Sequence, residues 1–498
     1  MGHARNQACK LRGRGPILGR NGFERAGGLV IGAISDTLGR GVENLSGAVS
    51  EAFFEPVIRL GVTGLSRAGK TVFITSLVAN LLDRGRMPGL QAASAGRIQS
   101  AFLQPQPDDT VARFDYETHL AALTGPAPHW PESTRAVSEL RLSIRVQPAG
   151  LLAGLSGPRT VHIDIVDYPG EWLLDLPLMD QSYDQWSAET LERIETRAEA
   201  AVFLTGLAEI DGADPLDEPV AQSMARSFAD YLKAAREAGY SDCTPGRFLL
   251  PGDLEGSPVL TFAPLPPGDA RRGSLRREMA RRYEAYKSRV VRPFFRDHFA
   301  RIDRQVVLVD ALGAIHAGPR AVEDLRGAMA GILAAFRPGR NSFLTALMGR
   351  RVEKILFVAT KADHLHHTQH PRLTAIMEAL LRDARGRADF AGATTEAMAI
   401  AALRATVEET RRHGGADLDL VRGTLLETGK AAAFHPGMLP EDPNHLLSPA
   451  RAGQETWLDA DYEVMRFAPA RLHLKPGEGP PHIRLDRAAE FLLGDKLR

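Results

Sequence analysis

The sequence predicts an α/β fold, with a mostly parallel sheet, helices on both faces and a helical insertion subdomain. Three features of the 498-residue chain support this prediction. A glycine loop stands between a short apolar segment and an apolar helix pattern. Further apolar runs typical of fully buried strands alternate with helical stretches, as in parallel sheets. Between two of these runs, residues 185–304 have mainly helical periodicity.

Composition is that of an ordinary globular protein. Hydrophobic residues make up 44% and charged residues 24%, and 61 basic residues balance 61 acidic ones, which favours neither nucleic acid nor an acidic substrate. Cys9 and Cys243 offer no disulfide framework and no metal-ligand spacing, as is typical of a reducing cytosol. The chain has no 18-residue apolar run, so we expect no transmembrane span and a cytoplasmic location.

Two segments precede the glycine loop. Residues 1–28 are predicted to form a flexible basic arm, with a weak contact to an anionic surface as the alternative. Residues 29–54 carry apolar side chains at steps of three or four, which predicts an amphipathic helix. Its polar face mixes both signs of charge, so we expect it to pack on the core rather than lie in a membrane.

The glycine loop has the spacing of a phosphate-binding loop. Gly64 and Gly69 are separated by four residues, and Lys70 and Thr71 follow, which is the Walker A pattern. The glycines let consecutive N–H groups point at one phosphate, while the following helix adds its positive end. Lys70 is expected to reach the β and γ oxygens, and the Thr71 hydroxyl to ligate Mg²⁺. The predicted nucleotide-binding residues here are Ser66, Arg67, Ala68, Gly69, Lys70, Thr71 and Val72.

After the glycine-loop helix, residues 86–134 are rich in Pro and Gly and show little periodicity. We therefore expect a long irregular segment, which in compact domains is usually functional. In proteins that act as nucleotide-dependent switches, the first mobile loop lies at this position in the chain. Our assignment of that switch is Thr134 for Mg²⁺ and catalysis, and Trp130 for stacking on the base, with a structural turn as the alternative. Ser133 and Arg135 are expected to bind nucleotide as well, and Thr110 and Thr124 are the competing threonines.

A second site follows a predicted hairpin. Alternating apolar residues in 139–146 and 160–166 predict two antiparallel strands. The second strand runs directly into Asp167-Tyr-Pro-Gly170. An acidic residue at the end of a strand can hold Mg²⁺, and a glycine three residues later can donate its N–H to a γ-phosphate. We therefore predict Asp167 as a metal residue and Gly170 as a nucleotide contact.

The part of the insertion from 269 to 304 holds twelve basic residues and five acidic ones. Apolar residues run through it at helical spacing, so a solvated basic face on a packed helix is favoured over nucleic acid or anionic lipid binding. Buried-strand patterns then return at 305–312, 354–359 and 398–404. A short strand at 481–486 and a helix at 488–493 are predicted to close an otherwise largely irregular tail.

The third site, Thr360-Lys361-Ala362-Asp363, indicates the base. Asp363 can accept hydrogen bonds from guanine N1–H and the exocyclic amine, and the Lys361 stem can lie along the ring. Adenine offers no such pair of donors, so a buried carboxylate would stay unsatisfied, at a cost of roughly 1 to 3 kcal/mol or more. His364 is expected to contact the nucleotide and begins a group of histidines (His364, His366, His367 and His370). Exposure to solvent or packing on the base edge is favoured for this group, and metal binding is the minor alternative. Ala402 and Leu403 are expected to offer a backbone N–H to guanine O6.

With these three sites the chain resembles P-loop GTPases of the Ras-like type, and more closely the YcjX-like NTPase family of bacteria. The likeness covers nearly the whole chain after about residue 35. The segments that carry it are 65–71 (LSRAGKT), 167–172 (DYPGEW), 245–253 (PGRFLLPGD), 359–364 (ATKADH) and 481–486 (PHIRLD).

The resemblance implies a protein that binds GTP with Mg²⁺ and hydrolyses it to GDP and phosphate, acting as a nucleotide-dependent switch in an envelope or stress response. It also implies a protein partner, with an inner-membrane protein as one candidate, and hence a location peripheral to that membrane. The alternatives are a guanine-nucleotide-binding scaffold with little turnover, or an ATPase. The expected segments are 1–28, the arm; 29–54, the amphipathic helix; 55–184 and 305–413, the two halves of the GTPase domain; 185–304, the helical insertion; and 414–498, the tail.

Two residues depart from the related pattern. Thr360 stands where related GTPases usually carry Asn, which we expect to loosen the loop without changing the base. Glu171 stands where Ras-like proteins place the glutamine that orients water, so we expect catalysis by Lys70, Thr134 and Glu171 but slow turnover without a partner. A favourable position at the start of a helix is the alternative role for Glu171.

Overall fold

The computed structural model describes residues 55–65, 67–132, 136–149, 157–335, 352–389, 393–457 and 462–498. The predicted arm and amphipathic helix of residues 1–54 lie outside the described residues. Residues 55–498 form one compact unit in which the predicted insertion is not separated from the sheet. The division of this unit into the segments expected from sequence stays a prediction.

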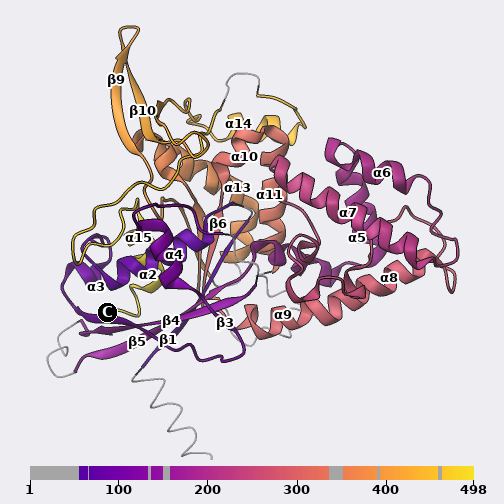
Figure 1. Cartoon of the computed structure of the whole chain (residues 1–498), viewed down its shortest axis with the longest axis horizontal. Helices are drawn as coiled ribbons and strands as arrows, with labels where there is room; N and C mark the ends of the chain where they lie inside the picture. Colours follow the sequence, from indigo (N-terminus) through magenta and orange to yellow (C-terminus); the bar gives the residue numbers. More distant parts are fainter. Residues whose placement is uncertain are drawn as a thin grey trace, which may run out of the picture. The chain divides into compact units, whose positions relative to one another are not determined.

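In the described part of the chain, eight strands form one sheet in the order β2-β4-β5-β1-β6-β7-β8, with β3 beside β4 (Figure 1). The pairs from β5 through β1, β6 and β7 to β8 are parallel, whereas β2, β4 and β5 pair antiparallel. The predicted hairpin and mostly parallel sheet are therefore confirmed. The strands are β1 (Val57–Gly64), β2 (Ile98–Gln104), β3 (Ala112–Arg113), β4 (Ser138–Val146), β5 (Arg159–Asp167), β6 (Arg304–Val309), β7 (Lys354–Ala359) and β8 (Thr394–Ala399).

Both faces of the sheet are buried. Val306 and Leu308 on β6 belong to one apolar cluster, and Val307 and Val309 belong to another, because successive side chains of a strand point to opposite faces. Residues of α2 (Lys70–Leu82) and α15 (Leu485–Leu493) fill the first cluster, and residues of α11 (Pro319–Ala335) and α13 (His370–Asp389) the second. The prediction of helices on both faces, and of a closing helix, is confirmed.

The chain between β5 and β6 is helical, as predicted, and Figure 1 shows α5, α6, α7 and α8 grouped together away from the strands. Aromatic side chains fill its core: the ring of Trp186 lies 6.1 Å from that of Phe228 and 5.1 Å from that of Tyr283. The basic Arg276 and Arg282 are buried and pair with acidic side chains, which fits a packed helix. The helices are η1 (Gly170–Asp180), α5 (Tyr183–Ile194), α6 (Ala201–Leu207), α7 (Glu218–Ala238), α8 (Leu275–Tyr286) and α9 (Arg292–Asp297).

The prediction of a long irregular segment at 86–134 is wrong. This segment contains α3 (Gln91–Ser94), β2, β3 and α4 (Tyr116–Thr124), the last of which begins where the Asp115 carboxylate accepts the N–H of Thr118. Strand β2 pairs with β4 alone and is half exposed on both faces, so it lacks the apolar alternation by which strands are recognised.

The tail also has more structure than predicted. A second, antiparallel sheet joins β9 (Val407–His413), β10 (Ala416–Thr424) and β11 (Ala431–Phe434), and α14 (Asn444–Arg451) follows. Strand β9 is mostly polar and exposed, so it has no apolar periodicity. The predicted strand at 398–404 is instead β8, which ends at Ala399, and the closing strand at 481–486 is reduced to one bridge between Ala401 and Ile483.

Candidate functional site

The predicted sites come together at one edge of the sheet. The glycine loop follows β1, Asp167 ends β5, Asp310 follows β6, and Lys361 and Asp363 follow β7. These four strands are parallel neighbours, so the loops after them emerge at the same edge. Neighbouring strands lie about 5 Å apart, which puts the ends of β1 and β7 roughly 10 Å from each other. One extended small molecule can therefore touch all of these loops.

The phosphate-binding loop is held in shape by its backbone. Gly69 has φ +76° and stands directly before α2, a left-handed conformation that glycine adopts without strain. The N–H of Leu65 donates to the carbonyl of Leu308 at 3.2 Å, which ties the loop to β6. Lys70 and Thr71 form the first turn of α2, with Thr71 buried. Of the other predicted contacts, Arg67 is exposed, Ala68 is buried, Val72 is half-buried and Ser66 lies outside the described residues.

The carboxylate of Asp167 is buried beside the lysine of this loop. Asp167 is 1% exposed, its Oδ1 lies 3.6 Å from Lys70 Nζ, and neither of its oxygens has a hydrogen-bond partner. A buried carboxylate without hydrogen bonds is costly unless a cation balances it. The neighbouring strands place Asp167 opposite Val62 of β1, close to the start of α2. The oxygen donors of Asp167 and Thr71 thus fit a hard cation such as Mg²⁺.

The start of η1 lies against the phosphate-binding loop. An added Cβ at Gly170 would come within 2.0 Å of the Gly64 carbonyl oxygen, so only glycine fits there. Glu171 follows as a buried residue of the first turn of η1. A Cβ at Gly246, a residue of the insertion, would in turn lie 2.0 Å from the Glu171 carbonyl oxygen. The glycine loop, η1 and the insertion are therefore in direct backbone contact.

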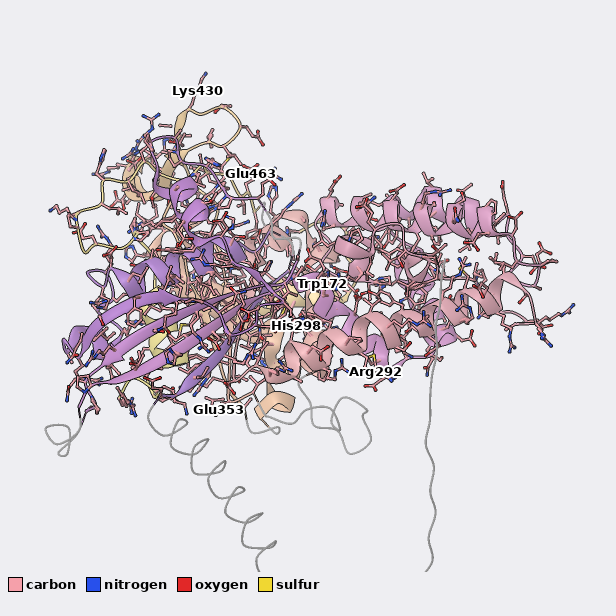
Figure 2. The ribbon with its side chains drawn as sticks, turned by 60° about the horizontal axis from the view of Figure 1, so that its bottom comes forward. Trp172, Arg292, His298, Glu353, Lys430 and Glu463 are labelled. Atoms are coloured by element: carbon pink, nitrogen blue, oxygen red, sulfur yellow. The ribbon has the colours of Figure 1, made fainter. Side chains whose placement is uncertain are left out.

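Further contacts fasten η1 to the insertion. The buried carboxylate of Asp175 accepts the N–H of Gly246 at 2.7 Å and the hydroxyl of Tyr286 at 2.5 Å. Burial raises the pKa of Asp175 to about 7, against the lowering effect of these hydrogen bonds. Trp172, labelled in Figure 2, carries the Arg247 guanidinium 3.3 Å from its ring centroid. A displacement of η1 must therefore move the segment that contains Gly246 and Arg247.

The loop after β7 has the arrangement of a base-recognition loop. Asp363 is 4% exposed, and its Oδ2 accepts the N–H of Ala405 at 2.8 Å. Lys361 has φ +60° and forms an ion pair with Asp310. The hydroxyl of Thr360 donates to the carbonyl of Val309 at 3.2 Å, which links the loop to β6. Asp310, Asp363 and Lys361 thus have fixed positions along the same sheet edge, after β6 and β7, whereas Asp167 lies at the end of β5.

The loop after β8 is anchored on both sides of the predicted guanine contacts. The N–H groups of Ala401 and Arg404 donate to the carbonyls of Ile483 and Pro481, respectively, at 3.1 and 2.8 Å. Ala402 and Leu403 lie between these two anchors. The 481–486 segment, conspicuous in the sequence but without a predicted role, therefore shapes this loop.

A small apolar cluster lies beside the same loop. Trp130, Ala405 and Phe467 pack together, and the Trp130 indole donates to the Phe467 carbonyl at 2.8 Å. The ring of His364 meets that of Phe467 edge-on at 5.2 Å, and burial lowers the pKa of His364. Trp130 and His364 therefore both lie near the predicted base contacts.

Ser133, Thr134 and Arg135 lie outside the described residues. The competing Thr124 donates its hydroxyl to Leu120 within α4, and Thr110 bonds to Asp108 on the surface. Sequence reasoning missed the roles of Asp310, Ala405, Gly246 and Phe467; of these, only Asp310 carried a signal, as an acidic residue directly after a buried strand.

In the described part of the chain, no helix is both long and apolar enough to cross a membrane.

Comparison with known proteins agrees with this arrangement. The chain is 37% identical over 461 residues to a protein of Escherichia coli (strain K12) named Ras-like GTPase YcjX, an alignment that covers 89% of this chain and 96% of that protein. It is 38% identical over 472 residues to the Ras-like GTPase YcjX of Shewanella oneidensis, covering 88% and 94%. The model of the YcjX-like family, DUF463, matches residues 58–497, and the chain belongs to this family.

Proposed function

We propose that this protein binds a guanine nucleotide with Mg²⁺ at the carboxyl edge of the sheet and hydrolyses GTP to GDP and phosphate. One observation carries the proposal: the Asp167 carboxylate is buried without a hydrogen bond and lies 3.6 Å from the lysine of a phosphate-binding loop. The two groups form only a long ion pair with each other, and a triphosphate with its cation would give Lys70 an anionic partner and Asp167 a cationic one. Relatives named Ras-like GTPase support guanine as the base.

In the proposed reaction, water attacks the γ-phosphate in line with the bond to the leaving GDP. Lys70 binds the β and γ oxygens and offsets the charge that develops on them, and the Gly170 N–H donates to the γ-phosphate. Thr71 and Asp167 would hold Mg²⁺, which when bound would neutralise further charge on the phosphates. Thr134 is still the residue that we propose for the first switch, where its hydroxyl would bind Mg²⁺.

Glu171 is proposed to hold the attacking water. Its carboxylate also repels the γ-phosphate, which predicts slow intrinsic turnover. Replacing Glu171 with Gln keeps a water acceptor and removes the repulsion. We therefore expect Glu171→Gln to increase the rate of phosphate release several-fold, whereas a residue that serves only the start of η1 would leave the rate unchanged.

Guanine rather than adenine is favoured by the loop after β7. Asp363 is buried at the sheet edge, about two strand spacings from the phosphate-binding loop, and a hydrogen bond from Ala405 fixes its orientation. Asp363 would accept both N–H donors of guanine, Lys361 would cover the ring, and Ala402 or Leu403 would donate to O6. ATP remains the alternative substrate.

We further propose that the helical insertion changes its position according to whether GTP or GDP is bound. The contact of Gly170 with Gly64, and of Gly246 with Glu171, joins the γ-phosphate sensor to the insertion without an intervening layer. A role in an envelope or stress response, and a protein partner at the inner membrane, are proposed on the family resemblance alone.

Turnover experiments separate a switch from a scaffold. Phosphate release from GTP should be measurable with the purified protein, should be abolished in Lys70→Ala, and should increase when membrane extract is added. Bound GDP that does not exchange, together with no stimulated turnover, would indicate the scaffold instead.

A further inference from the structure

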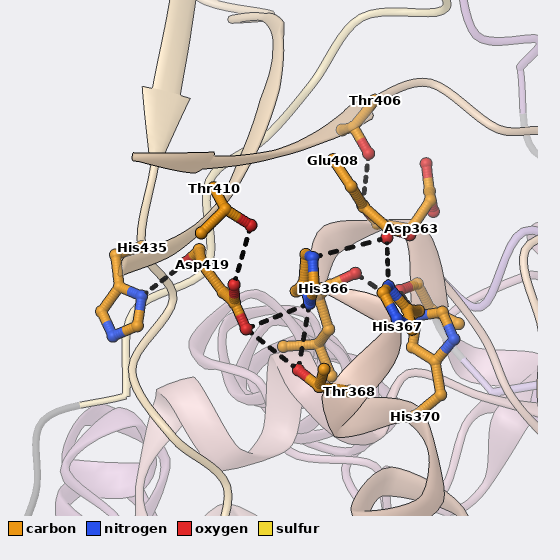
Figure 3. A network of polar contacts seen from close by, with 12 residues as sticks. Asp363, His366, His367, Thr368, His370, Thr406, Glu408, Thr410, Asp419 and His435 are labelled. Atoms are coloured by element: carbon orange, nitrogen blue, oxygen red, sulfur yellow. Dashed lines mark hydrogen bonds and ion pairs between the residues drawn. The ribbon is translucent and has the colours of Figure 1, made fainter. Parts of the chain in front are cut away.

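A cluster of histidines and carboxylates lies next to the base-recognition loop and outside the proposed catalytic machinery (Figure 3). His366 and His367 follow Asp363 by three and four residues, and Glu408 comes from β9. His367 Nδ1 lies 2.6 Å from Glu408 Oε2, and His366 Nε2 lies 3.7 Å from the same oxygen. One ligand atom from each of the three residues lies within 4.8 Å of the others. We propose that these three side chains bind a Zn²⁺ ion.

The spacing suits a tetrahedral ion. Bonds of 2.0–2.2 Å from nitrogen and oxygen to zinc place two ligand atoms about 3.4 Å apart. The separation of His366 Nε2 from Glu408 Oε2 is close to that value. The shorter contact between His367 and Glu408 is a hydrogen bond, which the ion would replace with two metal bonds. The His367 side chain is exposed, so its ring has room to rotate for this exchange.

The residues behind the ligands fix their orientation. Asp419 on β10 lies 3.2 Å from His366 Nδ1, so a proton on Nδ1 leaves the lone pair on Nε2, toward Glu408. Thr410 donates to the other oxygen of Asp419 at 3.1 Å, and Arg404 donates to Glu408 Oε1 at 3.2 Å. A carboxylate behind a ligating histidine is the usual support of a zinc site.

The chemistry of the donors selects the metal. Two imidazoles and one carboxylate suit zinc and its transition-metal neighbours, whereas Mg²⁺ and Ca²⁺ prefer oxygen ligands only. His366 is 7% exposed, while the His367 side chain is 66% exposed. The fourth position is therefore open to water, and the ion has a path from solvent.

Zinc at this position would link the two segments on either side of Asp363. His366 and His367 belong to the loop that carries Asp363, whereas Glu408 follows Ala405 and Thr406, which already bond to Asp363. The ion would hold these segments together more firmly than hydrogen bonds at the surface can. Its expected effect is a higher unfolding temperature of the nucleotide-free protein.

Zinc titration of the full-length, nucleotide-free protein tests the proposal independently of GTP. After treatment with a chelator, calorimetry should give one site for Zn²⁺ per chain that is weakened at least about tenfold in His367→Ala and in Glu408→Gln. His413→Ala, which removes an exposed histidine from the same strand β9, should bind zinc as the wild type does. Asp419→Asn should weaken binding about 10-fold to 100-fold, because it orients His366.

Cobalt provides a second readout, which reports the coordination geometry of the site. Co²⁺ in the site should give the strong visible absorption of a tetrahedral ion, and Glu408→Gln should lose it. Zinc should also raise Tm in the wild type and in His413→Ala but not in His367→Ala. Equal zinc affinity in wild type and His367→Ala, or a cobalt spectrum that is unchanged by Glu408→Gln, would overturn the proposal. Circular dichroism of each variant confirms that it is folded.

Discussion

Gly170 lies directly against Gly64: a Cβ at Gly170 would come within 2.0 Å of the Gly64 carbonyl oxygen and 2.5 Å of its carbonyl carbon. The first residue of η1 and the first glycine of the phosphate-binding loop are thus in van der Waals contact through their backbones. Since neither side can yield by rotating a side chain, any larger residue at 170 must displace η1 or the loop.

Gly170→Ala should therefore impair both folding and nucleotide response. We expect a loss of about 1 to 3 kcal/mol in the free energy of unfolding, because the added methyl group meets backbone atoms. GTP hydrolysis should fall at least about tenfold, since the N–H at 170 moves away from the γ-phosphate. Urea unfolding and phosphate release measure the two effects.

Gly206→Ala is the matched control, since Gly206 lies in α6 with open space around its Cβ position. This change should leave hydrolysis unaltered and should stabilise the helix slightly. Equal hydrolysis by Gly170→Ala and Gly206→Ala would contradict a role for the backbone contact.

Asp167→Asn should change stability and binding in opposite directions. Without nucleotide, Asp167 is a buried carboxylate with no hydrogen-bond partner and a single ion pair, to Lys70 at 3.6 Å. We expect the cost of burying the charge to exceed the gain from this long ion pair, so the neutral amide should raise the free energy of unfolding by about 1 kcal/mol. With nucleotide, the amide is a poorer Mg²⁺ ligand, so magnesium should no longer strengthen GTP binding. Chemical denaturation without ligand and GTP titration with and without Mg²⁺ measure both. A variant that is less stable and still responds to Mg²⁺ would show that Asp167 is structural.

Asp363→Asn should shift the preference among bases. Guanine presents two N–H donors to Asp363, and the amide of Asn can accept only one of them. We expect GTP affinity to fall about 10-fold to 100-fold, and binding of xanthosine triphosphate, which has an oxygen where guanine has the amine, to improve relative to GTP. Competitive displacement of a fluorescent nucleotide measures both affinities. Asp417→Asn, at an exposed position of β10, should change neither.

The buried carboxyl of Asp175 predicts a pH dependence of stability. Its pKa is raised to about 7 in the folded protein, above the ordinary value of 3.8, so the folded state binds more protons than the unfolded state in that interval. Stability should therefore decrease as pH rises from about 4 to about 7, by at most about 1.4 kcal/mol per pH unit from this group. Urea unfolding of wild type and Asp175→Asn across this range should give curves that converge toward low pH. Parallel curves would show that Asp175 does not titrate there.

The sequence predicted the central sheet and its ligand edge well, for a physical reason. Strands β6 and β7 are buried on both faces, so they read as continuous apolar runs, and the loops after them must meet at one edge because parallel neighbours end together. The Walker A spacing, Asp167 and Asp363 could be placed along that edge from residue order alone.

Strand β2, the β9–β10 hairpin and the contact between the insertion and η1 were not predicted from the sequence. Edge strand β2 has one neighbour, and strand β9 carries polar side chains that are mostly exposed, so neither shows an apolar period. Gly414 and Gly415, both with positive φ, form a two-residue turn between β9 and β10 and were the one local signal of that hairpin. The contact of Gly246 with Glu171 joins residues distant in sequence and depends on packing of the insertion, which no local pattern encodes.

The central claim is that a single guanine nucleotide is bound at once by the phosphate-binding loop and by the loop after β7. Displacement of a fluorescent GDP analogue by GTP and ATP, in wild type and Lys70→Ala, tests it most directly. GTP should compete at least about 100-fold better than ATP in the wild type, and Lys70→Ala should lose GTP binding. Equal competition by ATP and GTP, or unchanged GTP affinity in Lys70→Ala, would contradict the claim.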